Sequence, residues 1–487
     1  MKLSKKTLAR LNESDTLQLP VAGCFELPEK VLQFGTGVLL RGLPDAFIDK
    51  ANRQGLFNGR VVVVKSTGKG STGAFDDQDN LYTQCIRGIE GGQKVAMDIV
   101  NGSISRVLNA ASQWEQILAC AINPDMQIVV SNTTEIGIAY VAESIFAVPP
   151  ASFPAKLLAF LYKRYQHFSG DPGRGMVIIP TELIPDNGSR LKEILLELCA
   201  FNRLDDAFVD WLHNSNHYCN SLVDCIVPGA AAMDTGYEDE LMIMTEVYRL
   251  WAIETNSEQV RKVLSFSEAD AGVVLSPDIN VFRELKLRLL NGTHTLSCGL
   301  AFLAGIDTVV AAMNQESMAA YMEGLMMQEI IPAITGLHIR NDAAVRFAGA
   351  VLDRFRNPYI EHRWLSICTQ YTSKLKMRVV PVLLEYNQRT GQIPALISLG
   401  FAAHLLFMRG SETYSIQDEH AGWYQEQWQQ LPVDVLVRTT LSNKNLWGHD
   451  LTAIPGFAAV VTIMLNALLQ EGTAAYLERV AAEITIS

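Results

Sequence analysis

The chain has 487 residues, 48% of them apolar and 19% charged, which is the composition of an ordinary globular protein. That length corresponds to about two to three domains. Its formal net charge of −12 argues against nucleic acid or an anionic membrane as a partner, because both attract basic surfaces.

The N-terminal residues and the cysteines point to a compartment. No apolar signal core follows the first ten residues, and the longest apolar stretch, 456–469, is shorter than the roughly 20 residues of a membrane span. The eight cysteines lie far apart and form no Cys-x-x-Cys pair, so we expect neither a zinc site nor a disulfide framework. We therefore expect a cytoplasmic, zinc-independent protein.

Short runs rich in Val and Ile mark the first 180 residues, at 31–34, 60–65, 127–131 and 176–180. Such runs without polar alternation predict parallel strands that are buried on both faces. Helical patterns occur between them, for example at 107–121 and 155–167. The alternation predicts an α/β fold with a Rossmann-type, doubly wound sheet.

The pattern changes near residue 281. Long segments with helical periodicity follow, at 283–303, 318–331, 343–355, 395–408 and 458–469. The stretch 270–282 interrupts the pattern and predicts the boundary. We expect a dinucleotide-binding domain at 1–280 and a mainly α-helical substrate and catalytic domain at 281–487.

A Gly-x-Gly turn follows the first strand. Gly35 and Gly37 would let backbone N–H groups approach a pyrophosphate at a helix N-terminus, although Leu40 stands where the usual fingerprint has its third glycine. A strand-to-helix turn needs small residues in any case, so the spacing fits a turn without a ligand equally well. The candidate cofactor-binding residues of this turn are Phe34, Gly35, Thr36, Gly37 and Arg41, the last as a phosphate contact.

Two other strand ends are candidates for the same site. The second strand ends in Lys65 where an acid would bind the ribose of NAD, so NADP stays open beside NAD. The strand at 127–131 runs into Asn132 and Thr133, at the end of the sheet where α/β folds bind ligands. The alternative is that both residues cap a helix.

The second domain begins with Lys286, Asn291 and His294. At α-helical spacing these three share a sector of about 140°. Reducing a ketone requires a proton donor and hydrogen-bond donors at the developing alkoxide, and this set contains both. The alternative is a surface Lys, an Asn beside a glycine and a satisfied His.

The spacing Lys-x-x-x-x-Asn-x-x-His resembles the signature of the polyol-specific long-chain dehydrogenases, the mannitol dehydrogenase family. The resemblance continues in order along nearly the whole chain, through Gly-x-Gly-x-x-x-Arg at 35–41, Ser-Asn-Thr-Thr-Glu at 131–135 and Leu-Val-Asp at 222–224. It implies a Rossmann domain, a helical C-terminal domain, no metal and hydride transfer with NADH.

Within that family, the stretches 130–138, 179–188 and 291–305 most resemble the branch that interconverts D-tagaturonate and D-altronate in hexuronate breakdown. The implied partner is a small keto-hexuronate or hexonate. Reduction of fructuronate and oxidation of a polyol stay open within the family. A non-catalytic dinucleotide-binding sensor is the alternative from another class. The sequence does not indicate an oligomeric state.

The resemblance also implies roles for individual residues. Lys286 would be the acid/base, Asn291 would stabilise the alkoxide and His294 would contact the substrate. Asp224 and Lys374 match substrate-pocket positions.

Lys374 lies in a cationic run with Lys376 and Arg378, which is either a solvated surface or a carboxylate-binding element. Two positions depart from the mannitol enzymes, with Leu183 in place of a second catalytic Asn and Ser366 in place of an Arg. We expect Asn187 to supply the missing donor.

Overall fold

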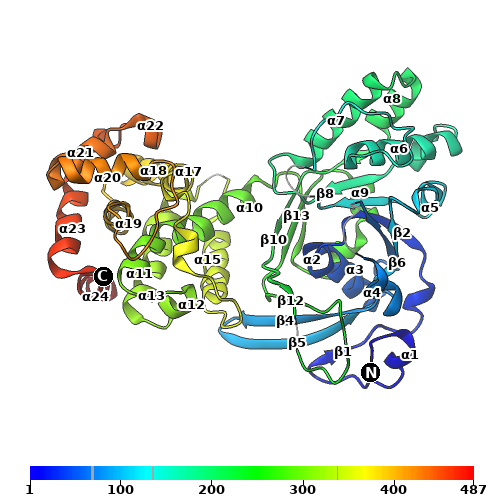
Figure 1. Cartoon of the computed structure of the whole chain (residues 1–487), viewed down its shortest axis with the longest axis horizontal. Coiled ribbons are helices and arrows are strands. Elements are labelled where there is room, and N and C mark those ends of the chain that lie inside the picture. Colours follow the sequence, from blue (N-terminus) through cyan, green and yellow to red (C-terminus); the bar gives the residue numbers. More distant parts are fainter. Residues whose placement is uncertain (67–70, 134–136, 232, 337, 487) are drawn as a thin grey trace. The chain divides into compact units, whose positions relative to one another are not determined.

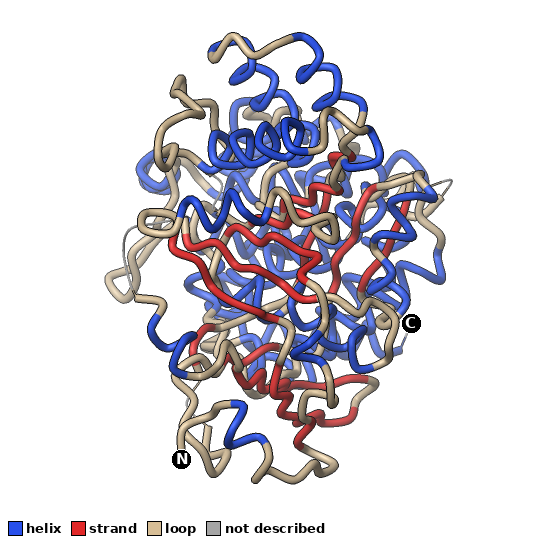
Figure 2. The backbone as a smooth tube through the Cα atoms, turned by 90° about the vertical axis from the view of Figure 1, so that its right-hand side faces the viewer, coloured by secondary structure: helices blue, strands red, loops and turns tan. Residues whose placement is uncertain are grey.

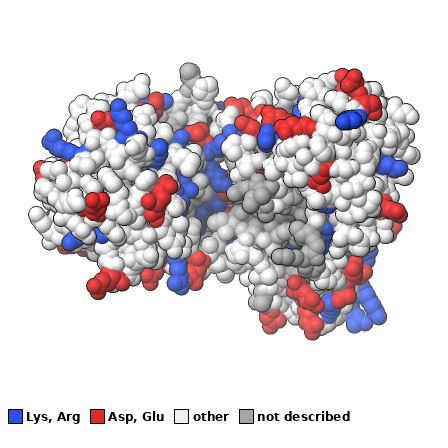
Figure 3. Space-filling model, turned by 45° about the horizontal axis from the view of Figure 1, so that its top comes forward, with Lys and Arg blue, Asp and Glu red and all other residues white. Residues whose placement is uncertain are grey.

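The computed structural model describes residues 1–66, 71–133, 137–231, 233–336 and 338–486. It divides into two compact units, the first comprising Met1–Arg87 and Lys94–Ile279 and the second Gly88–Gln93 and Asn280–Ser487. In the described ranges, no helix combines the length and apolarity needed to cross a bilayer. Acidic and basic side chains are interspersed on the face shown in Figure 3.

Unit 1 alternates strands and helices (Figure 1). Its strands are β1 (Leu17–Gln18), β2 (Glu29–Phe34), β3 (Arg60–Lys65), β4 (Tyr82–Glu90), β5 (Gln93–Asn101), β6 (Ile104–Asn109), β7 (Ile128–Ser131), β8 (Val177–Pro180), β9 (His217–Tyr218), β10 (Ser221–Asp224), β11 (Gly229–Ala230), β12 (Ile243–Thr245), β13 (Leu250–Glu254) and β14 (Val273–Ser276). Its α-helices are α1 (Lys5–Leu8), α2 (Val38–Gly42), α3 (Pro44–Arg53), α4 (Gly73–Asp77), α5 (Trp114–Cys120), α6 (Phe153–His167), α7 (Asn187–Phe201), α8 (Asp206–Asn214) and α9 (Glu258–Val263).

The central sheet of unit 1 has the order β6-β3-β2-β7-β8-β9, and every pairing in it is parallel. Figure 2 shows these strands side by side. This arrangement confirms the predicted Rossmann-type sheet. The strand order reverses between β2 and β7, so this is the switch point at which such sheets bind ligands.

Successive residues of the central strands enter two different cores. Leu32, Val62 and Val129 pack with α5, α6, α7 and α8 on one face. Val31 and Val61 pack with α3, α9 and the strands of the smaller sheets on the other. Burial on both faces is the reason these strands are unbroken Val and Ile runs.

The predicted helix at 107–121 is partly wrong. Residues up to Asn109 form the edge strand β6, in which Val107 and Leu108 pair with Val63 and Val64 of β3, and the helix α5 begins only at Trp114. A free edge of the parallel sheet decides this, because tertiary pairing overrides a short helical pattern.

Two smaller sheets complete unit 1. One has the order β1-β5-β4-β12-β11, and the other has the order β10-β13-β14. β10 is antiparallel to β13, and this pairing sets Asp224 opposite Leu250.

Unit 2 is mainly helical over its described residues from 280 onward, as predicted. Its elements are α10 (Asn280–Leu285), the π-helix η4 (Lys286–Gly292), α11 (Thr293–Leu303), α12 (Val309–Met313), α13 (Glu316–Gly324), the π-helix η5 (Leu325–Ile330), α14 (Ile331–Ile334), α15 (Asn341–Phe355), α16 (Trp364–Ile367), α17 (Tyr371–Arg378), α18 (Val380–Thr390), α19 (Ala395–Met408), α20 (Ala421–Gln430), α21 (Val433–Leu441), α22 (Lys444–Trp447), α23 (Phe457–Glu471) and α24 (Thr473–Ile486). The apolar helix α19 lies at the centre and packs against α11 and α23.

Candidate active site

The glycine turn of unit 1 lies at the switch point of the sheet. Gly35 has a φ of 130°, and a Cβ there would come within 2.9 Å of Leu40 Cδ1 and 3.0 Å of the Asn132 carbonyl oxygen. Its N–H donates to the Val64 carbonyl at 3.0 Å. Only glycine fits here, because both the backbone conformation and the neighbouring strand exclude a side chain.

Gly37 differs from Gly35 in both respects. It is exposed, has an ordinary φ of −63° as the N-cap of α2, and a Cβ there would meet no atom of the described residues within 4 Å. Within the part of the chain that the structure describes, packing therefore does not require glycine at this position. A phosphate group lying close to the backbone would require it, so the turn fits a dinucleotide.

A third packing glycine exists, but at a different position from the usual fingerprint. A Cβ on Gly42 would lie 2.7 Å from Thr245 Cγ2 and 3.1 Å from Val227 Cγ2. Gly42 therefore permits close packing of α2 on β12, and Leu40 is free to cover Gly35. The usual fingerprint does not predict a glycine at position 42, because its spacing assumes an uninterrupted helix, whereas α2 ends at Gly42.

The side chains of Phe34 and Arg41, two of the predicted cofactor contacts, lie inside unit 1. The Phe34 ring is fully buried against Phe153, so only its backbone faces the turn. The Arg41 guanidinium lies inside unit 1, donates to the Leu241 carbonyl and stacks over the Tyr82 ring at 5.3 Å. Desolvation lowers the pKa of Arg41. With these contacts its side chain is a packing element of the core, and they argue against a phosphate contact.

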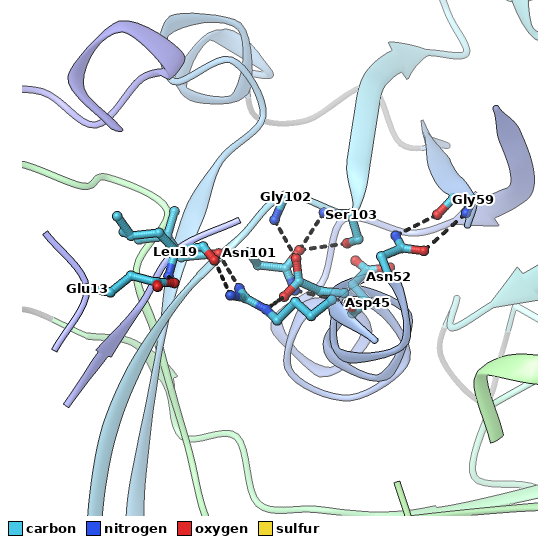
Figure 4. Close-up of polar contacts among 11 residues, drawn as sticks. Glu13, Leu19, Asp45, Asn52, Gly59, Asn101, Gly102 and Ser103 are labelled. Atoms are coloured by element: carbon cyan, nitrogen blue, oxygen red, sulfur yellow. Dashed lines mark hydrogen bonds and ion pairs between the residues drawn. The ribbon is translucent and has the colours of Figure 1, made fainter. Parts of the chain in front are cut away.

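Two buried polar side chains form hydrogen bonds that support the glycine turn. Gln33 Nε2 donates to the Gly35 carbonyl at 3.3 Å and to Asp45 Oδ2 at 3.1 Å, and both side chains are fully buried. Desolvation raises the pKa of Asp45 to about 7. Figure 4 shows the adjoining contact, in which Asn101 Nδ2 donates to the Asp45 carbonyl at 3.2 Å. Sequence reasoning missed this pair, although a Gln inside an apolar strand was its visible signal.

The polar residues after β7 are held by a buried acid. Glu182 Oε1 accepts hydrogen bonds from the Thr133 N–H at 2.9 Å and from Thr133 Oγ1 at 3.0 Å, and Oε2 accepts one from Ser131 Oγ at 3.1 Å. Asn132 Nδ2 donates to Thr181 Oγ1 at 3.0 Å. Burial raises the pKa of Glu182. Thr133 and Asn132 thus sit at the switch point, fixed to the end of β8. The rest of their motif, at 134–136, lies outside the described residues.

Two further candidates of unit 1 lie at strand ends. Lys65 is buried at the end of β3, and the following turn at 67–70 lies outside the described residues. Asp224 is buried at the end of β10.

Asn187 has a structural role. Its Nδ2 donates to the carbonyls of Glu182 and Ser221, and its Oδ1 accepts from the N–H groups of Gly188 and Ser221, all at 2.9 to 3.0 Å. These four contacts use the full capacity of the amide. They argue against Asn187 as the second oxyanion donor and leave that donor unassigned.

The candidate catalytic residues lie on one continuous helical segment of unit 2. Lys286 and Asn291 belong to the π-helix η4, and His294 lies in the first turn of α11. The wider π turn replaces the α-helical spacing assumed from the sequence, and π turns of this kind are frequent at functional sites. Lys286 and Asn291 are half-buried, whereas His294 is only 9% exposed.

His294 is held as a neutral imidazole. It stacks on Phe355 at a centroid distance of 4.4 Å and meets the edges of His362 and Trp364. Burial, followed by the nearby positive charges, lowers the pKa of His294 well below its usual value. Its Nε2 is buried and, within the described part of the chain, has no hydrogen-bond partner. A neutral His with a free ring nitrogen is suited to a hydroxyl or carbonyl group of a ligand.

The predicted cation Lys374 lies near this segment, on α17. It is half-buried and its Nζ donates to the Ile367 carbonyl at 2.9 Å. Burial lowers the pKa of Lys374, and Arg378 lowers it further. Arg378, four residues on, belongs to the cationic run noted in the sequence, but only Lys374 of that run was predicted as a site residue. No cluster of three or more His, Cys, Asp or Glu side chains suited to a metal ion occurs in the described ranges.

Family models match both units. The Rossmann domain of mannitol dehydrogenase matches residues 29–265, and the C-terminal domain of mannitol dehydrogenase matches residues 278–469. The chain belongs to the mannitol dehydrogenase family. This family membership makes it a sugar oxidoreductase with a Rossmann domain of the mannitol dehydrogenase type.

Curated relatives in this mannitol dehydrogenase family are similar along almost their whole length. An altronate oxidoreductase of Bacillus subtilis (strain 168) is 37% identical, with 93% of this chain and 95% of that protein covered. An altronate oxidoreductase of Klebsiella pneumoniae (strain 342) is 38% identical, with 92% and 96% covered.

Solved structures agree on the fold. The Pseudomonas fluorescens mannitol 2-dehydrogenase ternary complex with NAD and D-mannitol has a TM-score of 0.67 at 21% identity, with 99% of this chain and all of that chain covered. A D-sorbitol dehydrogenase in substrate-free form has a TM-score of 0.78 at 18% identity, with 98% of this chain and all of that chain covered.

Proposed function

We propose that this protein interconverts D-tagaturonate and D-altronate with NAD(H), in hexuronate breakdown. The observation that carries the substrate is the similarity to altronate oxidoreductases, which extends over more than nine-tenths of the chain. The arrangement of unit 2 supports the chemistry, because a lysine, an amide and a neutral imidazole follow one another along a single helical segment.

The proposed roles follow from the chemistry of each side chain. Lys286 transfers the proton to and from the substrate oxygen, since an ammonium group on a half-buried side chain can donate to an alkoxide. The Asn291 amide donates to the same oxygen. His294, neutral and with a free Nε2, contacts the substrate beside it. When bound, the nicotinamide dinucleotide supplies or accepts the hydride.

The cofactor residues of unit 1 hold the dinucleotide in this proposal. The backbone of Gly35, Thr36 and Gly37 binds the pyrophosphate, and Asn132 and Thr133 line the adjacent strand end. Lys65 stands at the position where an acidic residue usually binds the ribose of NAD. NAD is proposed because the mannitol 2-dehydrogenase relative was solved with NAD.

The test is oxidation of NADH, followed by its absorbance, with D-tagaturonate, D-fructuronate and D-fructose in parallel, repeated with NADPH. Turnover on tagaturonate with NADH supports the proposal. Preferred turnover on fructuronate or fructose would assign that compound as the substrate instead. Preferred use of NADPH would assign NADP(H) as the cofactor instead. Binding of NADH without turnover of any of the three supports a sensor.

A further inference from the structure

Lys374 and Arg378 form a pair of cations on one side of α17. They are four residues apart, which places them on neighbouring turns of the same face. Both are half-buried. In the part of the chain that the structure describes, neither forms an ion pair with an acidic side chain. Two half-buried positive charges without a carboxylate partner are costly unless an anion binds there.

Arg378 is connected to the candidate catalytic segment by hydrogen bonds. Its Nη1 donates to Thr295 Oγ1 at 3.1 Å, and Thr295 Oγ1 donates to the Asn291 carbonyl at 2.7 Å. Thr295 also follows His294 directly. The guanidinium is therefore two hydrogen bonds from the residue proposed to hold the substrate oxygen.

Basic side chains also surround His294. After burial, the groups that lower the pKa of His294 are His362, Arg354, Arg378 and Lys374. Every one of these groups is basic. An anionic group of a ligand beside His294 would enter a favourable field.

The backbone of Arg378 is fixed to the same segment. Arg288 Nη1 donates to the carbonyls of Met377 and Arg378 at 2.7 and 3.1 Å, while its Nε donates to Glu284 Oε2 at 2.9 Å. These carbonyls end α17 and lack partners within the helix. Arg288 lies in η4 between Lys286 and Asn291, so the segment that carries the proposed catalytic residues also orders Arg378 before a ligand binds.

The guanidinium keeps most of its hydrogen-bonding capacity. An arginine offers five N–H donors in a planar fork, and Thr295 is the one acceptor that Arg378 reaches within the described ranges. A carboxylate matches that fork in geometry and charge.

We infer that Arg378, together with Lys374, binds the carboxylate of the substrate and selects sugar acids over neutral polyols. This inference rests on the proposed function, whose substrate carries its carboxylate at the other end of the chain from the keto group. A neutral polyol would leave both cations without a counter-ion, and unpaired polar groups in a site are a strong source of discrimination.

The test compares Arg378→Met and Arg378→Lys with the wild type in the full-length enzyme. We expect Arg378→Met to raise KM for D-tagaturonate about 10- to 100-fold, the range of a charge-assisted hydrogen bond, with a smaller effect on kcat. Arg378→Lys keeps the positive charge but loses the planar fork of N–H donors, so its KM should lie between those of the wild type and Arg378→Met. The matched control is Lys376→Met, an exposed lysine of the same helix, which should keep the wild-type KM.

Calorimetric binding of D-altronate and D-mannitol separates the two hypotheses without using turnover. If Arg378→Met loses affinity for D-altronate but not for D-mannitol, the role of Arg378 is supported. This holds even if the wild type turns over neither hexuronate. Absence of that turnover would contradict the proposed function alone. Wild-type affinity of a folded Arg378→Met for D-altronate overturns the role of Arg378. If Arg378→Met fails to fold, the same two measurements are made on Arg378→Lys. A KM for D-tagaturonate and an affinity for D-altronate equal to those of the wild type would then overturn the inference.

Discussion

The carboxylate of Glu329 accepts a hydrogen bond from the backbone N–H of Leu396 at 2.7 Å, and the two residues are 67 positions apart in the chain. A second bond of 2.7 Å comes from the N–H of Ile397. These two N–H groups lie in the first turn of the central helix α19. The N-cap residue of α19 is Pro394, whose side chain has no hydrogen-bond acceptor. An acid on the π-helix η5 therefore caps a helix to which it does not belong.

Removing this cap should destabilise unit 2. We expect Glu329→Ala to lower the free energy of unfolding by about 2–4 kcal/mol, because two buried N–H groups lose their acceptor. Urea unfolding followed by circular dichroism measures the change. Glu323→Ala, an exposed position of α13, should stay within about 0.5 kcal/mol of the wild type. Equal effects of the two substitutions would contradict the capping role.

The two glycines of the cofactor turn should separate folding from binding. We expect Gly35→Ala to lower stability by about 1–3 kcal/mol, because of its φ of 130° and the 2.9 Å approach of Leu40. Gly37→Ala should melt like the wild type but bind NADH more weakly, since its added methyl occupies the space assigned to the phosphates. Thermal melting and fluorescence titration with NADH measure the two effects. Unchanged NADH affinity in Gly37→Ala would remove the main argument for this turn as the pyrophosphate site.

Lys286 should matter for chemistry and not for cofactor binding. We expect Lys286→Ala to lower kcat about 10²- to 10⁴-fold, the usual contribution of a general acid or base, while the Kd for NADH stays nearly unchanged. Steady-state kinetics and NADH titration give the two readouts. Lys376→Ala provides a comparison at an exposed lysine and should keep the wild-type kcat. A parallel loss of turnover and NADH binding would point to a structural role for Lys286.

Asp45 should make stability depend on pH. Its folded pKa of about 7 lies above the ordinary value of 3.8, because burial disfavours the carboxylate. Between these values the folded protein holds the proton that the unfolded chain releases, so stability falls as pH rises towards 7. Asp45→Asn cannot ionise, and its stability relative to the wild type should rise by about 2–3 kcal/mol from pH 5 to pH 8.

Urea unfolding at both pH values checks this expectation. Asp125→Asn, at an exposed position, should show no such trend. A stability difference between Asp45→Asn and the wild type that does not change with pH would show that Asp45 is ionised in the folded protein throughout this range.

The local sequence determined the framework of this protein. The Val and Ile runs at 60–65 and 127–131 could be recognised as buried parallel strands because burial on both faces leaves no room for polar alternation. The long helices α15 and α19 followed from periodicity alone. Gly35 could be assigned to the turn because a strand that passes directly into a helix needs a residue free of a side chain.

Only the tertiary structure decided which polar side chains remain available for a ligand. Arg41 and Asn187 have residue types and positions suited to a site, yet the fold uses the guanidinium for Leu241 and the amide for four backbone groups. Arg378, one cation in a run of three, is set apart by its contact with Thr295 on a helix 83 residues away. Such assignments depend on partners distant in sequence, and a local pattern carries no record of which distant group satisfies a hydrogen bond or a charge.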